Sequence, residues 1–569
     1  MEIGNNKISV IQMADDTTLF LNDPISLQRS LLLFTLFGRI SGLKINIGKS
    51  EAMGLGIYAN LFIIKPYGLL WKDKSLSSLG VFYSKDPNET IEVNFNNKLN
   101  KVQSLLNMWS QRNLSIKGKI TVIKSTVLPQ ILYLCANLGV PDWFVSKINS
   151  ITYHFIWSAK MDKVKRTTLI NKIEKGGLKM IDLESMIQAQ RVIWIKRLFK
   201  QSNGAGWTFY MKYSCNKLNI NPEDLVKCDL NPEYICNTWP LVYHQMLFSW
   251  FRFKAITPRL SPWDIRRKVL VFNKDILIGN RYARGTYLKW FSKGIKQIHN
   301  LYDNKGNLHT VSYLEIKYST HIDILSYNSL ISAIPPEWKR LIKDIPIHFN
   351  AISFDELPHI DINERKSPVT LITNKCVYWK LVQEITQPPV SQRAWDLLFN
   401  EQENNWSHIF KIPYEVTFET QLQSFHYKIL LRIFPCNWYV SKFDPSVVNM
   451  CTFCHEPTDD ICHYFYDCEL CRQFWEDIKS WIRLKFNIGN FDEYVNRRNV
   501  ILGTNPNVEH KFSINFILLY AKWFIYIKKK NNTNRLNILE FINMVKSKAN
   551  INFIVAKHQN NQTVVSCLH

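Results

Sequence analysis

The spacing of one Cys–His cluster constrains the fold of this chain more than any other sequence feature. Cys451-x-x-Cys454 is followed after eight residues by His463 and after four more by Cys468. Thiolate and imidazole ligands at such spacing can close a tetrahedron around Zn²⁺. The sequence therefore predicts a structural zinc site in which protein fills all four positions and leaves no place for a catalytic water.

The local pattern leaves alternatives at this cluster. His463 and Cys468 are five residues apart, so an α-helix would place them on adjacent faces and would have to distort slightly to bring them together. Cys462, Cys471 and His455 compete for individual positions. The alternative interpretation is a group of reduced cysteines without metal. No signal peptide is recognisable, so a reducing, intracellular environment is expected, and clustered cysteines there favour metal over disulfides.

The charge balance indicates the class of partner. The 569 residues contain 71 Lys and Arg against 47 Asp and Glu, a formal net charge of +24. A field of that sign attracts polyanions, and nucleic acid is the leading candidate. The alternative is a basic protein without a polyanionic partner. A hydrophobic content of 46% is enough for buried cores, and the length favours three or four domains.

No membrane partner is expected. The most apolar late stretch, residues 512–527, contains Asn515 and Lys522 and is shorter than the ~20 residues that a spanning helix needs. We interpret this stretch as a core helix. The lysine run at 528–530 is interpreted as a solvated helix end, with nucleic-acid contact as the second interpretation.

Two carboxylates stand at a predicted turn near the N-terminus. Short apolar runs at 8–13 and 17–21 flank Ala14-Asp15-Asp16, which predicts a tight β-hairpin. Asp23 then precedes Pro24, which predicts a helix that ends at Gly42. Paired Asp side chains suit Mg²⁺, although most such pairs only favour turns.

The residues around this turn resemble a known polymerase palm. Residues 13–20 read Met-Ala-Asp-Asp-Thr-Thr-Leu-Phe, residues 41–46 read Ser-Gly-Leu-Lys-Ile-Asn, and Lys49 follows. This block closely resembles the palm of LINE-type, non-LTR retrotransposon reverse transcriptases. The resemblance implies that Asp15 and Asp16 bind catalytic Mg²⁺. It also implies that Lys49 assists the departing pyrophosphate, whereas the plain alternative is a solvated lysine after a turn.

A second hairpin extends the resemblance, and two positions depart from it. Leu79 and Gly80 match the hairpin with which the family grips the primer end, although Ser78 stands where the family has an aromatic residue. Met13 stands where the family has Tyr or Phe, and its flexible apolar side chain can fill a similar gap. The resemblance therefore implies nucleic-acid contact at Leu79 and Gly80.

The palm implied by this resemblance is incomplete. Two-metal polymerisation needs another carboxylate from a strand upstream of the hairpin. The residues before Asp15 contain no Asp, and Glu2 is their only acid. The template- and nucleotide-binding segments of the family are absent as well. We therefore expect that the chain alone does not polymerise DNA.

The segment after the predicted palm is basic. An amphipathic helix is predicted over residues 96–108, and Arg112, Lys117, Lys119 and Lys124 follow it. Such side chains can neutralise phosphates without reading base sequence. In the family a helical thumb lies on the primer–template backbone, and the resemblance implies that role here. The alternative is a solvated basic helix face.

The resemblance continues to the C-terminal helices. Residues 290–303 and 329–339 are similar to connecting segments of the family, and we assign them structural roles without chemistry. The Cys–His cluster resembles the Cys-Cys-His-Cys module at the C-terminus of LINE reverse transcriptases. In the family this module is linked to RNA or target-DNA binding.

The predicted fold is an α+β palm remnant followed by mainly α regions and a small zinc module. Mg²⁺ is expected at a vestigial hairpin site and Zn²⁺ at the cluster, with RNA and DNA as partners, including primer–template and target DNA. Three functions stay open: an RNA-directed DNA polymerase fragment that is inactive alone, a non-enzymatic RNA- or DNA-binding protein, and the inert product of a truncated element. The predicted domains are the partial palm 1–90, thumb-like helices 91–200, a helical connecting region 201–420, the zinc module 421–485 and C-terminal helices 486–569.

Overall fold

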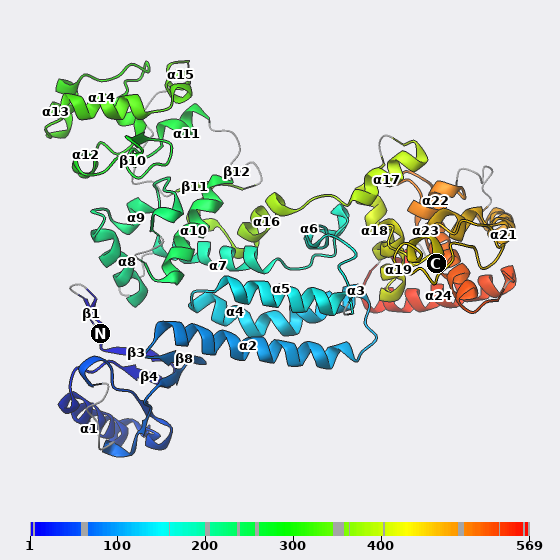
Figure 1. Ribbon diagram of the computed structural model, residues 1–569, viewed down its shortest axis with the longest axis horizontal. Coiled ribbons are helices and arrows are strands. Elements are labelled where there is room, and N and C mark those ends of the chain that lie inside the picture. The colour runs from blue at the N-terminus through cyan, green and yellow to red at the C-terminus, as the bar shows by residue number, and fades with distance from the viewer. Residues whose placement is uncertain are drawn as a thin grey trace. The chain divides into compact units, whose positions relative to one another are not determined.

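The computed structural model shows a mostly helical chain with small sheets (Figure 1). This confirms the predicted mainly α character, whereas the assignment of the first sheets to a polymerase palm stays a prediction. The description covers all residues except 1, 4–5, 59–65, 159, 200–204, 236–238, 257–260, 345–357, 363–364, 402–403, 487–493, 534, 562–563 and 567–569.

The chain forms two compact units, each assembled from three separate stretches of sequence. Unit 1 contains Met1–Val102, Pro129–Ile148 and Leu183–Glu384. Unit 2 contains Gln103–Leu128, Asn149–Asp182 and Ile385–His569. The Asp-Asp hairpin therefore belongs to unit 1, and the Cys–His cluster belongs to unit 2.

The strands of the described residues pair in twos. Five pairs are antiparallel and β5–β6 is parallel. The strands are β1 Glu2–Ile3, β2 Asn6–Lys7, β3 Val10–Met13, β4 Asp16–Leu19, β5 Glu51–Ala52, β6 Leu70–Trp71, β7 Ser75–Ser78, β8 Val81–Ser84, β9 Leu277–Ile278, β10 Arg281–Tyr282, β11 His359–Ile362 and β12 Arg365–Pro368.

Helices carry most of the remaining described chain. Up to residue 344 they are α1 Pro24–Ser41, α2 Pro87–Ser110, α3 Ile116–Val122, α4 Leu128–Asn137, α5 Asp142–Ile156, α6 Arg166–Ile170, α7 Leu183–Leu198, α8 Gly206–Asn216, α9 Pro222–Leu225, α10 Leu241–Ala255, α11 Pro262–Arg266, α12 Thr286–Ser292, α13 Val311–Tyr318, α14 Ile324–Ala333 and α15 Pro336–Asp344. Beyond it they are α16 Asn374–Ile385, α17 Val390–Phe399, α18 Trp406–Val416, α19 Thr420–Leu430, α20 Asn437–Val440, α21 Glu469–Phe486, α22 Arg497–Leu502, α23 Lys511–Lys530 and α24 Ile538–His558. Two π-helical turns interrupt this pattern, η4 Ile123–Val127 and η9 His463–Asp467.

The first hairpin forms as the sequence predicts. Strands β3 and β4 pair with Met13 opposite Asp16, so Ala14 and Asp15 make a two-residue turn. Ala14 has a φ of 54°, in the left-handed region that the tightest hairpin turns require. Helix α1 follows, with the Asp23 carboxylate accepting a 2.7 Å hydrogen bond from the backbone N–H of Ser26. It ends at Gly42, whose φ is 74°.

Helix α1 has no buried residue within the described structure. Its exposed apolar side chains include Leu33 at 65% and Ile40 at 89%. These apolar side chains are therefore not packed in a core of the described structure.

The connecting region of unit 1 packs around its own core. Trp290, Ile295, Leu301 and Trp338 are buried in one apolar cluster there. Gly294 has a φ of 111° directly before Ile295, a conformation that an L side chain rarely adopts. Residues 290–303 and 329–339 thus contribute buried side chains and a turn to this core, in agreement with the structural roles assigned to them.

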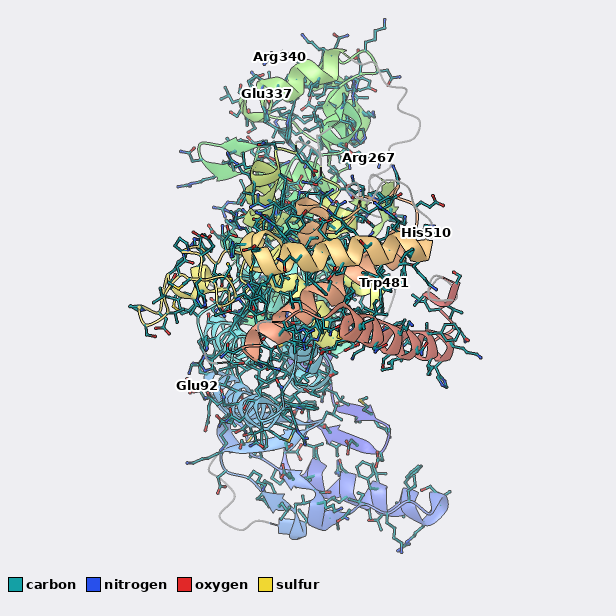
Figure 2. The ribbon with its side chains drawn as sticks, turned by 90° about the vertical axis from the view of Figure 1, so that its right-hand side faces the viewer. Glu92, Arg267, Glu337, Arg340, Trp481 and His510 are labelled. Carbon is teal, nitrogen blue, oxygen red and sulfur yellow. The ribbon has the colours of Figure 1, made fainter. Side chains whose placement is uncertain are left out.

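The core of unit 2 is built largely from aromatic side chains on its last helices. Helix α23 buries most of its length, which confirms the core helix predicted at 512–527. Trp475 of α21 is buried and donates a 2.7 Å hydrogen bond to the carbonyl of Phe465. Trp481, labelled in Figure 2, meets the Phe541 ring of α24 edge to face at 6.2 Å.

One helical run, residues 116–137, is long and apolar enough to cross a bilayer by length and composition alone. A core helix passes the same test, and Ile120, Val127 and Ile131 of this run are buried in the protein. Lys119 also lies in it and is 8% exposed. The predicted absence of a membrane partner stays a prediction.

Candidate metal centre and basic surface

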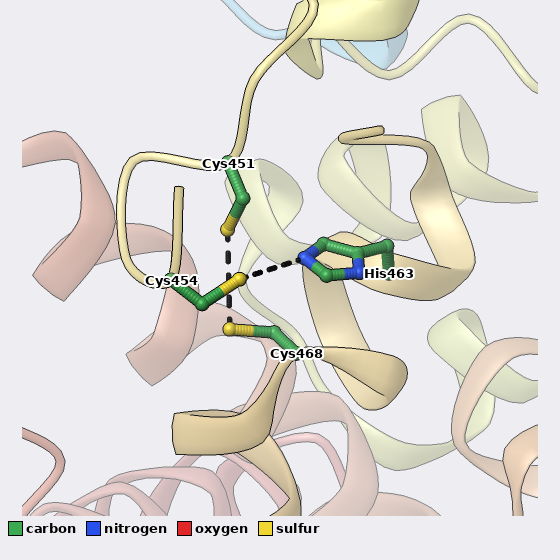
Figure 3. Close-up of side chains that lie close together, drawn as sticks. All are labelled: Cys451, Cys454, His463 and Cys468. Carbon is green, nitrogen blue, oxygen red and sulfur yellow. Dashed lines mark hydrogen bonds between the residues drawn. The ribbon is translucent and has the colours of Figure 1, made fainter. Parts of the chain in front are cut away.

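The four residues of the Cys–His cluster meet at one point in unit 2 (Figure 3). The ligand atoms of Cys451, Cys454, His463 and Cys468 all lie within 4.8 Å of one another. The two sulfurs of Cys451 and Cys468 are 3.9 Å apart, and the Cys454 sulfur lies 3.2 Å from His463 Nε2. Zinc–sulfur bonds of about 2.3 Å place two sulfurs of a tetrahedron roughly 3.8 Å apart. The cluster could therefore hold a metal such as zinc.

The first pair of ligands sits on a tight loop. The backbone N–H of Cys451 donates to the carbonyl of Glu456 at 2.9 Å, and His455 N–H donates back to the Cys451 carbonyl at 3.0 Å. His455 itself adopts a left-handed φ of 61°, which closes the loop. These bonds turn the chain so that Cys451 and Cys454 present their sulfurs to the same side.

A π-helical turn brings the second pair of ligands, His463 and Cys468, together. The turn η9 begins at His463, and the N–H of Cys468 donates to the His463 carbonyl five residues earlier, at 3.1 Å. The wider turn brings residues five apart onto one side, as insertions of this kind do at functional sites. The slight distortion that the sequence required is thus confirmed, and Cys462, Cys471 and His455 are not members of the group.

The protein around the thiols disfavours the free thiolate form. A hydrogen bond to the Cys468 sulfur, together with burial, raises the pKa of Cys451 to about 12. Burial also raises the pKa of the neighbouring Cys462 to about 12. A divalent cation reverses this balance at its ligands because metal-bound sulfur is deprotonated, so metal binding would release protons.

The predicted magnesium site has no comparable geometry. Asp15 and Asp16 are both exposed on the first hairpin. Among the residues that the structure describes, no group of three or more acidic, His or Cys side chains includes either aspartate. Lys49 is exposed at the end of a short 3₁₀ helix, Ile47–Lys49. Binding of Mg²⁺ and the catalytic roles of these three residues stay predictions.

The predicted primer-contacting residues form a second tight hairpin. Leu79 and Gly80 connect β7 to β8, with φ values of 49° and 74°. Two successive positive φ values make a turn that suits the twist of paired strands. The Leu79 carbonyl accepts a 2.9 Å hydrogen bond from the Tyr133 hydroxyl, and Thr18 of β4 lies 3.4 Å from Ser78 through their hydroxyl oxygens. The hairpin exists, whereas its contact with a primer is untested.

Lys119 faces the interior, in contrast to its predicted role at a phosphate. Its ammonium group donates to the Phe155 carbonyl at 2.9 Å and to the Ser158 hydroxyl at 2.6 Å. Burial lowers the pKa of Lys119, and the charge of Lys428 lowers it further. These bonds hold the Lys119 ammonium group inside the protein, and its predicted contact with a phosphate stays a prediction. Arg112, by contrast, is exposed.

Lys117 and Lys124 lie close to a third lysine that the sequence did not single out. The Lys117 ammonium donates to the Gln423 side-chain oxygen at 2.9 Å and lies over the Tyr414 ring at 4.7 Å. Burial lowers the pKa of both Lys117 and Lys124, and the charge of Lys179 lowers each further. Lys179 is exposed and has a left-handed φ of 56° directly after the turn at 176–178. The Gly-Gly pair at 176–177 was the signal that a turn would present this lysine.

We call Lys117, Lys124 and Lys179 the basic surface of unit 2. No described carboxylate forms an ion pair with any of the three. Like charges held together without acids favour a bound anion, because an anion relieves their repulsion.

Comparison with known proteins relates part of the chain to a transposon protein and to a putative ribonuclease H protein. No family model matches it. The transposon TX1 uncharacterized 149 kDa protein of Xenopus laevis is 24% identical over 274 residues, which are 46% of this chain and 20% of that protein. A putative ribonuclease H protein of Arabidopsis thaliana is 23% identical over 125 residues, 21% of this chain and 20% of that protein.

The chain spans about one fifth of the length of each curated protein that it matches. These partial similarities support a retrotransposon-related protein. The finer assignment to a LINE-type reverse transcriptase goes beyond them.

Proposed function

We propose that this chain is a nucleic-acid-binding part of a LINE-type reverse transcriptase and that it does not polymerise DNA by itself. The order of its motifs supports the family assignment, since the Ala-Asp-Asp turn, the second hairpin, the basic helices and the Cys–His cluster follow one another as in that family. Similarity to a transposon protein of Xenopus laevis points the same way. RNA and DNA are the proposed partners.

The observation that carries the nucleic-acid proposal is the basic surface of unit 2. Lys117 and Lys124 are partly buried, and the charge of Lys179 opposes the protonation of both. Phosphate oxygens neutralise such a group, and each neutralised phosphate releases condensed counterions. Two half-buried lysines beside the exposed Lys179 therefore favour the nucleic-acid backbone over a single small anion.

The Cys–His cluster supports a structural rather than a catalytic metal in the proposed function. Its four protein ligands would fill a tetrahedral shell around a bound metal, so no coordination position would remain for a reacting water. We propose that zinc occupies the cluster and that it holds together the loop at 451–456 and the turn η9. In this proposal the metal stabilises a module near the C-terminus and takes no part in chemistry.

The salt dependence of binding tests the nucleic-acid proposal. Duplex binding loses affinity with salt by a logarithmic slope of about 0.9 per neutralised phosphate. Replacing Lys117, Lys124 and Lys179 together by Gln should make the slope shallower by roughly 2 to 3, since up to three phosphate contacts are lost. Fluorescence anisotropy of labelled duplex and single-stranded oligonucleotides over a series of salt concentrations measures both slopes.

A charge-matched variant is the control. Lys289, Lys293 and Lys305 are exposed lysines of unit 1, and their replacement by Gln lowers the net charge equally. This control should keep the wild-type slope. Equal slopes in the wild type, the basic-surface variant and the control would show that the basic surface does not bind the nucleic acid. If the wild type shows no salt-dependent binding, the inert product of a truncated element is the better description.

A further inference from the structure

A buried lysine of helix α23 reaches the Cys–His cluster from outside the ligand set. Lys529 is only 4% exposed, and its ammonium nitrogen lies 3.4 Å from the Cys451 sulfur as a hydrogen-bond donor. It lies 3.7 Å from a carboxylate oxygen of Asp459, which is also buried. The lysine run at 528–530 was interpreted from the sequence as a solvated helix end. Lys529, the middle residue of this run, is buried instead.

Aromatic rings from both halves of the cluster enclose this ammonium group. It lies 5.0 Å from the ring centre of Phe453, in the loop between Cys451 and Cys454, and 4.0 Å from that of Tyr464, in the turn η9. Cations are stabilised over aromatic faces, and more so away from water. Lys529 therefore contacts both segments that a metal would join.

A charge placed so deeply needs compensation. Removing an ammonium group from water costs several kcal/mol unless negative charge and hydrogen bonds replace the solvent. A divalent metal with three thiolates and a neutral imidazole carries one net negative charge, spread mainly over its sulfurs. One of those sulfurs is the hydrogen-bond partner of Lys529.

We infer that Lys529 is a positioning residue of the metal centre, whose buried ammonium group neutralises thiolate charge and orients the Cys451 sulfur. The inference rests on the zinc binding proposed above. Helix α23 would then contribute to the metal centre through Lys529, although it supplies no metal ligand. Outer-shell partners of this kind raise metal affinity by fixing the ligand and offsetting its charge.

Asp459 offers the competing explanation, namely that Lys529 only pairs with this carboxylate. The geometry favours the sulfur, because 3.7 Å exceeds hydrogen-bond length and the Asp459 oxygen that faces Lys529 has no described hydrogen-bond partner. The second oxygen of Asp459 accepts a 3.1 Å bond from the Asn437 N–H. Asp459 therefore has a structural task of its own.

Zinc affinity of the full-length chain separates the two explanations. Lys529→Met keeps a similar side-chain volume without the charge, and it should weaken zinc binding about 10- to 100-fold in competition with a chromophoric chelator. Lys529→Arg should recover most of the affinity because it keeps the charge and an N–H donor. Lys530→Met, at the exposed neighbouring position, is the control and should bind zinc as the wild type does. Asp459→Asn should not weaken zinc binding.

Cobalt substitution adds a readout that a purely structural role would not move. Loss of the N–H donor to sulfur should shift the thiolate-to-cobalt charge-transfer band of Lys529→Met, while its visible bands keep the tetrahedral pattern. An unchanged band and affinity would overturn the inference and leave the zinc proposal intact. So would equal losses in Lys529→Met and Asp459→Asn.

Two further outcomes are decisive. If Lys529→Met does not fold, Lys529→Gln carries the test because it also removes the positive charge, and a zinc affinity equal to that of the wild type overturns the inference. A reduced wild-type protein without stoichiometric zinc overturns both the metal centre and the inference.

Discussion

Two buried lysines of α23 lie seven residues apart in opposite electrostatic surroundings. Lys529 has a carboxylate and a thiol beside it. Lys522 is 1% exposed, and its ammonium nitrogen lies 3.1 Å from His426 Nδ1 and 3.4 Å from the Ile501 carbonyl. Burial holds the pKa of Lys522 well below its usual value, with no acid to offset it. The surroundings of Lys529 therefore favour its charged form, whereas burial disfavours the charged form of Lys522.

Lys522 should make stability depend on pH. Its pKa is lowered in the folded state, so between that value and the ordinary 10.5 the unfolded chain binds more protons and folding stability rises with pH. One such proton corresponds to about 1.4 kcal/mol per pH unit. Urea denaturation midpoints at pH 7 to 9 should therefore rise more steeply for the wild type than for Lys522→Met. Lys530→Met, exposed on the same helix, should keep the wild-type slope, and parallel curves for Lys522→Met would refute the assignment.

The spacing of Lys117, Lys119 and Lys124 could have predicted which of them share a helix face. Helix positions two apart point to nearly opposite sides, whereas positions seven apart share a side. Lys117 and Lys124 therefore belong together, and Lys119 belongs to the other face, which the structure buries. Helical spacing could not predict that Lys179 lies near Lys117, because Lys179 follows a turn far along the chain.

Among the elements, those defined by local rules were predictable. The Asp23 cap, the Gly42 stop and the tight turn at Ala14 follow from short-range backbone preferences, and all three are present. The π turn η9 was foreseeable only as a distortion, since the ligand spacing demands one without fixing its type. The short strands β9 to β12 were not predicted, because β9 and β10 have only two residues each and β12, Arg365–Pro368, shows no apolar alternation.

Loss of one ligand should unfold the cluster as a unit. Cys454→Ala removes a sulfur from the loop at 451–456, and metal-dependent modules lose their fold with their metal. We expect zinc content to fall below stoichiometry, and amide hydrogen exchange to accelerate at residues 451–468. Cys376→Ala is the matched control, because Cys376 is equally half-buried but lies in unit 1 away from any described metal-ligating group. Unchanged exchange in Cys454→Ala would show that the cluster folds without metal.

At the scale of the whole molecule, sequence order and spatial grouping differ. Each compact unit draws on three stretches of chain, because helices far apart in sequence pack together. Helices α7 and α10, for example, pack against each other within unit 1. The family resemblance predicts the order of the segments along the chain. Their grouping into two compact units depends on long-range packing, which local sequence patterns do not predict. The predicted domain boundaries at 90, 200, 420 and 485 stay predictions.

Polymerase activity requires more carboxylates than the two aspartates of the first hairpin. Two-metal phosphoryl transfer requires enough carboxylates to hold both ions. Asp15 and Asp16 are exposed, and no third described acid joins them in a metal-ligating group. The purified chain should therefore extend a primer no better than the Asp15→Asn, Asp16→Asn double variant, with either Mg²⁺ or Mn²⁺. Gel analysis of a labelled primer on an RNA template measures this, with an active reverse transcriptase as the positive control. Processive extension that the double variant abolishes would mean that another acidic side chain completes the site, because synthesis by a contaminant would survive the substitution.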